Sequence, residues 1–332
     1  MVIDFPEREV HGGTGKRQRE KTQKNILDFS ESINPFPPVF PWDIDLSSLK
    51  QYPDDRYYEL KEKIGRIFCR APSEICVGNG SIELIRVFCL ITLSGNKKFF
   101  TESHTFGEYA LSSRLAGAQR TKNPLESDVS FLCNPNNPTG TLRTKVEMTS
   151  YLEEIKSCRG MLFCDEAFIE LSDPAQSMVG VHDPALFVLH SLTKSFSVPG
   201  IRFGYGFGDV DLIEKIEITR PPWSVNAFAE AYALLAFQHW DELTKSRADV
   251  AVERAVLAEG IKALGLNCCP SSANFLLIEC GRNVTPLCNC LANRDILVRD
   301  CTSFGLPTCI RVAVRTRDEN RIFLEALSAC IR

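Results

Sequence analysis

The chain has 332 residues, of which 44% are hydrophobic and 24% charged, and its formal net charge at neutral pH is −4. This composition is typical of a folded globular protein of about two domains, and it excludes the fibrous and disordered classes. The weak acidity, the lack of any apolar run near ~20 residues and the lack of a signal-peptide pattern predict a cytoplasmic protein with neither nucleic-acid nor membrane partners.

The first 40 residues predict an extended arm, because prolines cluster between positions 35 and 41 and apolar residues show little periodicity. From about residue 55 to 215, helical patterns alternate with short apolar runs. The helical patterns cover 57–69, 81–93 and 145–157, and the apolar runs cover 128–133, 161–164 and 186–189. Short buried strands that alternate with helices predict an α/β fold with a mainly parallel sheet flanked by helices.

Two prolines, Pro221 and Pro222, close this alternating pattern. A long helical pattern follows over 227–264, then apolar runs over 273–279, 296–299 and 309–314, and a last helical pattern over 319–331. The change predicts a second, smaller α+β domain. We therefore expect an arm over 1–40 that associates with the small domain and the active site, a large domain over 41–220 and a small C-terminal domain over 221–332.

Cysteine is abundant, with 14 residues, eight of them between positions 268 and 330. No Cys-x-x-Cys pair is present, so the usual zinc and redox spacings are missing. Disulfides are not expected in a large chain without a secretion signal. The sequence therefore predicts free thiols that pack as small apolar side chains, and no metal site.

Three of the apolar runs lead into a polar residue of distinct chemistry: Asn137, Asp165 and Lys194. Ligands of open α/β sheets bind beyond the carboxyl ends of the strands, so we expect these side chains to meet at one site. A lysine amine can form a Schiff base with an aldehyde cofactor, and a carboxylate can keep a pyridine nitrogen protonated. An amide can donate to a ring oxygen. The implied cofactor is pyridoxal phosphate.

The phosphate of such a cofactor needs hydrogen-bond donors, and the sequence offers two groups of them. Gly80, Ser81 and Ile82 open a helical pattern, where free backbone N–H groups can hold an anion. The second group flanks the lysine and comprises Ser191, Thr193 and Arg202, and Phe106 can stack on the cofactor ring. The glycines at 204, 206 and 208 suggest a dinucleotide site instead, but Asp209 stands where the third glycine of that fingerprint belongs.

Several motifs together are similar to those of a known family. They are Asn136-Asn137-Pro138-Thr139-Gly140, Asp165-Glu166-Ala167 and Ser191-Leu192-Thr193-Lys194, followed by Pro199-Gly200-Ile201-Arg202-Phe203-Gly204. The chain resembles the fold-type-I pyridoxal-phosphate enzymes of the histidinol-phosphate aminotransferase group. The resemblance implies that Lys194 bonds the cofactor, that Asp165 faces the pyridine nitrogen and that Asn137 faces the ring oxygen. It also implies a homodimer in which Tyr52 reaches the cofactor phosphate of the neighbouring subunit.

Within that group the chain looks more like the threonine-phosphate decarboxylases of cobalamin synthesis than like the aminotransferases. Phe168 supports this, because aminotransferases of the group have tyrosine there. The other motifs are His11-Gly12-Gly13, Leu27-Asp28-Phe29-Ser30-x-x-Ile33-Asn34-Pro35, Pro222-Trp223-Ser224-Val225-Asn226-Ala227 and Ile310-Arg311-Val312-Ala313-Val314-Arg315. The resemblance implies decarboxylation of L-threonine O-3-phosphate to (R)-1-amino-2-propanol O-2-phosphate. It assigns the substrate phosphate to Arg299, the carboxylate to Arg311 and further substrate contacts to His11, Gly12, Asn34 and Asn137.

Two other functions stay open at this point. The nearer one is a histidinol-phosphate or related aminotransferase, which would consume a 2-oxo acid. The farther one is a non-catalytic relative that uses the same fold to bind the cofactor or to regulate. The presence of Lys194, Asp165 and Arg311 disfavours this second alternative.

Overall fold

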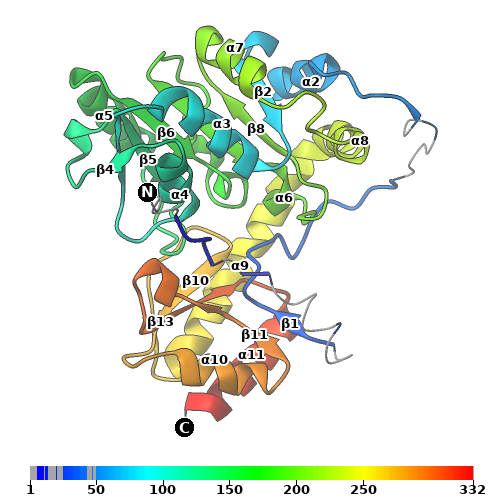
Figure 1. The fold of residues 1–332 in the computed structure, drawn as a ribbon. Helices are drawn as coiled ribbons and strands as arrows, with labels where there is room; N and C mark the ends of the chain where they lie inside the picture. Colours follow the sequence, from blue (N-terminus) through cyan, green and yellow to red (C-terminus); the bar gives the residue numbers. More distant parts are fainter. Residues whose placement is uncertain are drawn as a thin grey trace.

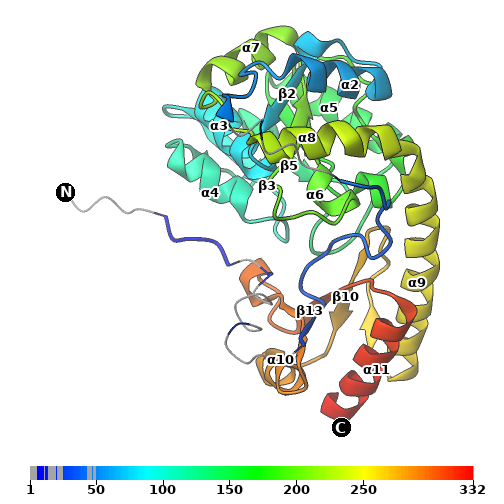
Figure 2. The same cartoon turned by 90° about the vertical axis from the view of Figure 1, so that its right-hand side faces the viewer.

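The computed structural model describes residues 6–10, 12–13, 20, 25–42, 47 and 50–331. The chain forms two bodies, one around a seven-stranded sheet and one around a four-stranded sheet, as Figure 1 shows. Helix α9 (Leu243–Ala263) runs from the first body down along the second, and the N-terminal arm passes between them (Figure 2). The expected division at residues 40 and 220 stays a prediction.

The seven-stranded sheet has the order β2-β8-β7-β6-β5-β3-β4. All neighbouring strands pair in parallel except β8, which is antiparallel to both β2 and β7. The strands are β2 (Ile75–Gly78), β3 (Lys98–Thr101), β4 (Gln119–Arg120), β5 (Val129–Cys133), β6 (Met161–Asp165), β7 (Leu186–Ser191) and β8 (Gly204–Phe207). The prediction of a mainly parallel sheet flanked by helices is confirmed.

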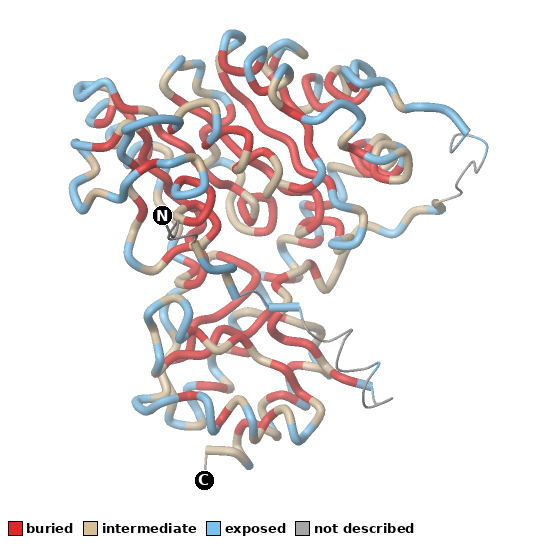
Figure 3. Tube along the Cα trace, viewed as in Figure 1, coloured by how far each residue is buried: buried red, intermediate tan, exposed pale blue. Residues whose placement is uncertain are grey.

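Helices cover both faces of this sheet, so its central strands are buried along their length (Figure 3). One core packs beneath α2 (Tyr58–Phe68), α5 (Lys145–Ser157) and α8 (Ala227–Ala236). The other lies beneath α3 (Ser81–Leu93), α4 (Glu108–Leu115) and α7 (Val210–Thr219). A sheet buried on both faces explains why its strands have continuous apolar runs in the sequence.

The smaller body contains an antiparallel sheet of order β12-β13-β10-β9. Its strands are β9 (Asn267–Cys268), β10 (Phe275–Glu279), β12 (Arg299–Asp300) and β13 (Cys309–Ala313). Helices α9, α10 (Thr285–Ala292) and α11 (Arg317–Ile331) complete its core. The arm joins this core through β1 (Leu27–Asp28), which pairs in parallel with β11 (Ile296–Leu297).

Two elements differ from the sequence prediction. The single helix expected over 227–264 is interrupted by the 3₁₀ turn η6 (Phe237–Glu242), where His239 leaves the helical region with φ −103° and ψ 20°. The strand expected over 296–299 is divided between β11 and β12, which belong to different sheets. Apolar periodicity continues through both positions, so the pattern did not reveal either break.

The prediction of free thiols was wrong at one pair, because Cys290 and Cys330 form a disulfide with their Cα atoms 5.9 Å apart. The two cysteines lie on α10 and α11, which pack against each other in the small body. Their separation of 40 residues hides this proximity in the sequence. Within the described ranges no group of His, Cys, Asp and Glu is placed to hold a metal ion, and no helix there has the length and apolar character needed to cross a membrane.

Candidate active site

A cavity of about 400 Å³ lies where the arm and the two bodies meet. Strands β5, β6 and β7 end at this cavity, and the small body contributes two arginines. Most of the site residues expected from the sequence line it, namely Gly12, Ser81, Ile82, Phe106, Asn137, Asp165, Ser191, Thr193, Lys194, Arg202, Arg299 and Arg311. Side chains that are up to about 300 positions apart in the chain are therefore brought to one place.

Lys194 lies in the short helix α6 (Leu192–Ser195), directly after β7. Its backbone is joined to the arm, since the backbone N–H of Asn34 donates to the Lys194 carbonyl at 2.9 Å. Loss of water around the amine lowers the pKa of Lys194 to about 8, and the positive charge of Arg311 acts in the same direction. A lysine with such a pKa has a far larger neutral fraction near physiological pH than a surface lysine, and the neutral amine can act as a nucleophile.

Asp165 is the last residue of β6 and is buried. Tyr109 donates its hydroxyl proton to Asp165 Oδ2 at 2.6 Å, and the Ala167 N–H donates to Oδ1 at 2.9 Å. Burial raises the pKa of Asp165, and these two hydrogen bonds oppose that rise. The carboxylate is held in one orientation, as a partner for a protonated ring nitrogen requires.

The donors for an anion lie at the start of α3 and around Lys194. Ser81 is the first residue of α3, and the Ser191 and Thr193 hydroxyls are 2.8 Å apart. Gly80 has a φ of 77°, and a Cβ atom at this position would overlap the Arg202 guanidinium. The glycine therefore leaves room for Arg202 beside the free N–H groups of the helix, which is the arrangement that holds a phosphate.

Arg311 reaches into the cavity from β13 and is buried. It donates to the Asn137 side-chain oxygen and, at 2.9 Å, to the Ser30 carbonyl. Burial lowers the pKa of Arg311 to about 10, and it forms no ion pair with a carboxylate of the described residues. Its buried Nε also has no hydrogen-bond partner within that part of the chain. A buried cation in this condition favours an anionic ligand.

Arg299 lies on β12, where it pairs with Arg311 of the neighbouring strand β13, and it also lines the cavity. Its Nη2 donates to the Val10 carbonyl and to Ser303 Oγ, each at 2.6 Å, and the guanidinium lies 5.1 Å from the centre of the Phe304 ring. Burial lowers the pKa of Arg299 as well. Two guanidinium groups thus line the side of the cavity formed by the small body.

Two aromatic residues define the walls near Lys194. Phe168 is buried, and the Lys194 amine lies 5.8 Å from the centre of its ring. Phe106 meets the Tyr109 ring edge-on at 5.5 Å. Both rings line the cavity and can cover a flat cofactor ring.

Not all expected residues line the cavity. Gly80 lies next to Arg202, which lines the cavity. The side chain of Asn34 is buried and forms hydrogen bonds with backbone groups instead. The Asn34 side-chain NH2 donates to the Ser195 carbonyl at 2.7 Å, and its oxygen accepts from the Phe36 N–H at 2.9 Å. This arrangement fixes the arm next to Lys194. His11 lies outside the described residues.

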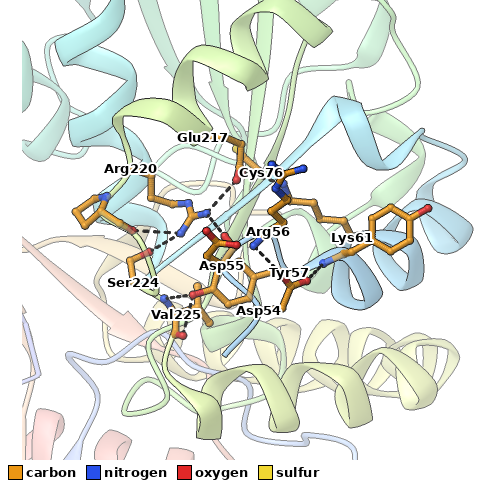
Figure 4. A network of polar contacts seen from close by, with 12 residues as sticks. Asp54, Asp55, Arg56, Tyr57, Lys61, Cys76, Glu217, Arg220, Ser224 and Val225 are labelled. Atoms are coloured by element: carbon orange, nitrogen blue, oxygen red, sulfur yellow. Dashed lines mark hydrogen bonds and ion pairs between the residues drawn. The ribbon is translucent and has the colours of Figure 1, made fainter. Parts of the chain in front are cut away.

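Tyr52 lies away from the cavity of its own chain and is 79% exposed, and its ring packs against that of Trp223 with the centroids 4.6 Å apart. The two chain segments that contain this aromatic pair are joined by a polar network, shown in Figure 4. Arg220 donates to the Asp55 carbonyl at 2.8 Å and to Glu217 at 2.9 Å, and the Tyr57 hydroxyl bonds the backbone of Val225. The network therefore joins the segment that follows Tyr52 to the segment that contains Trp223.

Tyr109 is the main site residue that the sequence reasoning missed. It follows Phe106 by three positions and lies at the start of α4, so both rings fall on one face. That spacing was the available signal. The cavity lining also includes Glu31 and Ser32 of the arm, which no motif had singled out.

The glycines that suggested a dinucleotide site have a packing role. Gly204 and Gly206 lie on β8, where Cβ atoms would overlap Ser81 and the Phe187 ring, respectively. Close packing thus accounts for both residues.

Comparisons with known proteins agree with this geometry. Residues 25–327 match the family of class I and II aminotransferases. A histidinol-phosphate aminotransferase of Symbiobacterium thermophilum is 29% identical over 95% of this chain and 93% of the relative. A protein provisionally named threonine-phosphate decarboxylase, from Caldanaerobacter subterraneus subsp. tengcongensis, is 34% identical over 91% of this chain and 92% of its own length.

Among solved structures, the histidinol-phosphate aminotransferase of Sinorhizobium meliloti in complex with pyridoxal-5'-phosphate superposes with a TM-score of 0.87. The alignment covers 100% of this chain and 96% of that chain at 17% identity, so it establishes the shared fold. The buried amine, the fixed carboxylate and the phosphate-type donor set described above suit that cofactor. The chain therefore belongs to the class I and II aminotransferase family and is a pyridoxal-phosphate-dependent enzyme with the type I fold.

Proposed function

We propose that this enzyme decarboxylates L-threonine O-3-phosphate to (R)-1-amino-2-propanol O-2-phosphate, the linker of the cobalamin nucleotide loop. The observation that carries the proposal is Phe168, which presents an apolar ring near Lys194 where aminotransferases of the related group have a tyrosine. The provisionally named decarboxylase also has the higher identity of the two relatives above, 34% against 29%.

The charges of the cavity support a substrate with two anionic groups. Arg311, which has no carboxylate partner among the described residues, would hold the substrate carboxylate, and Arg299 would hold the phosphate. The side-chain oxygen of Asn137 accepts a hydrogen bond from Arg311. Asn137 would therefore be within reach of both the substrate carboxylate and the cofactor. Gly12 and its neighbour in the sequence, His11, would contact the substrate from the arm.

On the cofactor side, Lys194 would form the covalent bond and Asp165 would face the ring nitrogen. Ser81, Ile82, Ser191, Thr193 and Arg202 would surround the phosphate, and Phe106 would stack on the ring. Pyridoxal phosphate, when bound, supplies an aldehyde that bonds the substrate amine and a ring that accepts the electrons released at Cα.

The direction of the substrate carboxylate decides which reaction occurs. The bond that breaks must lie perpendicular to the cofactor ring, so a decarboxylase has to hold the carboxylate there and an aminotransferase the Cα–H. Binding of the substrate phosphate to Arg299, away from the reacting Cα, would supply the binding energy that fixes this orientation. After loss of carbon dioxide, the Lys194 amine or a water molecule would return a proton to Cα.

The alternative is a histidinol-phosphate or related aminotransferase, and the relative from Symbiobacterium thermophilum favours it, since it matches 95% of this chain. We further propose a cytoplasmic homodimer in which the exposed Tyr52 reaches the cofactor phosphate of the second subunit.

The test is to incubate the purified holoenzyme with L-threonine O-3-phosphate, without any oxo acid, and to follow the release of carbon dioxide. Sustained release that is lost in Lys194→Ala would support the decarboxylase. The parallel reaction contains histidinol phosphate and 2-oxoglutarate. Amino transfer there, with no release of carbon dioxide in the first reaction, would replace the proposal with the aminotransferase.

A further inference from the structure

A buried ionic cluster lies behind Asp165, outside the residues that line the cavity. It consists of Glu166, which follows β6, His190 on β7 and Glu170 in the 3₁₀ turn η4 (Ile169–Leu171). The side chains of His190 and Glu166 are 1% and 0% exposed, and that of Glu170 is 10% exposed. None of the steps proposed above uses these residues.

The imidazole of His190 lies between two carboxylates. Its Nε2 is 2.9 Å from Glu166 Oε2, and its Nδ1 is 3.6 Å from Glu170 Oε1. The Tyr205 hydroxyl is 3.4 Å from Nδ1, and the rings of Phe68 and Phe207 pack edge-on against the imidazole. These contacts leave the imidazole side chain 1% exposed.

Two features of this geometry favour a charged His190. An ionised carboxylate only accepts hydrogen bonds, and a neutral imidazole has one donor and one acceptor nitrogen. Glu166 Oε2 can accept a hydrogen bond from Nε2 at 2.9 Å, and Glu170 Oε1 at 3.6 Å forms an ion pair with a charged ring, whereas the Tyr205 hydroxyl near Nδ1 can either donate or accept. Two buried carboxylates are also costly without nearby cations. The charge of Arg247, whose Nε donates to the Glu170 carbonyl, acts on Glu170, whereas Glu166 is otherwise met by the neutral Ser177 hydroxyl and the Met178 N–H. We infer that His190 is an imidazolium ion.

The cluster is coupled to Asp165 through the sheet. Strands β6 and β7 are parallel neighbours in which Asp165 pairs with Leu189, the residue before His190. The Glu166 N–H donates to the Leu189 carbonyl at 2.8 Å. The positive charge of His190 lowers the pKa of Asp165, which burial raises, while the charge of Glu166 raises it. The net field at Asp165 thus depends on the state of His190.

We propose that His190 is a positioning residue that keeps Asp165 ionised, so that the proton shared with the cofactor ring stays on the ring nitrogen. The inference rests on the proposed role of Asp165. Asp165 lines the cavity and His190 does not, so the His190 charge would stabilise the carboxylate more than it destabilises a protonated nitrogen in the cavity. Loss of this charge moves the proton from the nitrogen toward Asp165.

The substitution His190→Gln separates charge from structure. A glutamine amide still donates to Glu166, but it carries no charge. His182→Gln is the matched control, because His182 also faces a carboxylate, with Nδ1 3.0 Å from Glu74, but its side chain is 58% exposed. Asp165→Asn is the reference for a site that cannot hold the proton on the ring.

The experiment loads each protein with pyridoxal phosphate labelled with ¹⁵N in the ring and records the nitrogen chemical shift without substrate. We expect the wild type and His182→Gln to show a protonated nitrogen and Asp165→Asn an unprotonated one. The ring-nitrogen shift of His190→Gln should lie between these two values, because its ratio of protonated to unprotonated nitrogen should be at least tenfold lower than that of the wild type. A folded His190→Gln holoenzyme with the wild-type shift would overturn the inference. A protonated nitrogen in Asp165→Asn would instead overturn the assigned role of Asp165.

A second measurement does not depend on the folding of a variant. The chain contains five histidines, so ¹⁵N-histidine labelling gives few signals, and substitution of the other four histidines identifies that of His190. We expect both ring nitrogens of His190 to be protonated at neutral pH. A neutral tautomer at this position would contradict the proposal.

Discussion

The amine of Lys194 loses its proton more easily than a surface lysine because the cavity removes water from it and places Arg311 nearby. The neutral amine is the form that attacks an aldehyde. Since the pKa is lowered to about 8, the neutral fraction grows as the pH rises through that value. We expect the rate at which the cofactor-free protein takes up pyridoxal phosphate to rise with pH, with a midpoint near 8, in stopped-flow absorbance. A rate that is flat from about pH 6 to pH 9 would contradict this charge state.

Arg299 is the second residue whose surroundings predict a measurable effect. Its guanidinium is oriented by Val10 and Ser303, and it faces the cavity in which the phosphate is proposed to bind. Arg299→Ala should weaken binding of L-threonine O-3-phosphate by about 2–5 kcal/mol, the cost of losing a buried charged contact. Steady-state kinetics would show this as a higher KM.

Two comparisons separate this effect from general damage. The exposed Arg294, replaced by Ala, should leave KM unchanged. Phosphate-free L-threonine should bind equally well to the wild type and to Arg299→Ala. An equal loss for both ligands would show that Arg299 does not hold the phosphate.

At the scale of secondary-structure elements, the arm is held by a few residues at β1. The Phe29 N–H donates to the Leu297 carbonyl at 2.7 Å, and the Phe29 carbonyl accepts from Ala313 at 2.8 Å. Its ring is fully buried against Phe323 of α11, with centroids 4.9 Å apart. The next residue of the arm, Ser30, accepts a hydrogen bond from Arg311. The packing of Phe29 therefore fixes one wall of the cavity.

We expect Phe29→Ala to lower the free energy of unfolding by about 3–5 kcal/mol, as for other large core truncations. It should also raise KM, because the Ser30 carbonyl no longer holds Arg311. Urea unfolding and steady-state kinetics measure the two effects. Val39 lies on the same arm but is 90% exposed, so Val39→Ala should change stability by less than about 0.5 kcal/mol. Equal stabilities of the two variants would show that the arm does not contribute to the core.

The lengths and ends of the strands and helices explain what the sequence could and could not predict. Asn137, Asp165 and Lys194 were found because each follows an apolar run, and strand ends share one edge of a parallel sheet. The short strands β2, β3 and β8 have four residues each, too few for a periodic pattern, and β8 is half glycine. The helix break at His239 and the Cys290–Cys330 disulfide depend on tertiary packing, which local periodicity does not record.

At the scale of the whole molecule, the site needs both bodies and the arm. The residues proposed to hold the cofactor come mainly from the large sheet, whereas the two arginines proposed to bind the substrate come from β12 and β13 of the small body. His104, which follows β3, joins the two bodies, because its Nδ1 lies 2.7 Å from the Phe304 carbonyl beside Arg299. A relative movement of the bodies would therefore change the distance between Lys194 and Arg299, the arginine proposed to bind the substrate phosphate, so under this proposal the orientation of the substrate depends on both bodies.

In the proposed dimer, Tyr52 belongs to the site of the other subunit. Activity should therefore be impaired in a dimer of Tyr52→Ala subunits and abolished in a dimer of Lys194→Ala subunits. A mixed dimer of the two variants, however, contains one site with an intact Lys194 from one subunit and an intact Tyr52 from the other. Equal mixing after dissociation should restore roughly a quarter of the wild-type sites, because half of the dimers are mixed and each has one complete site. If Tyr52 served its own subunit, mixing would restore nothing, and activity would stay at the average of the two variants.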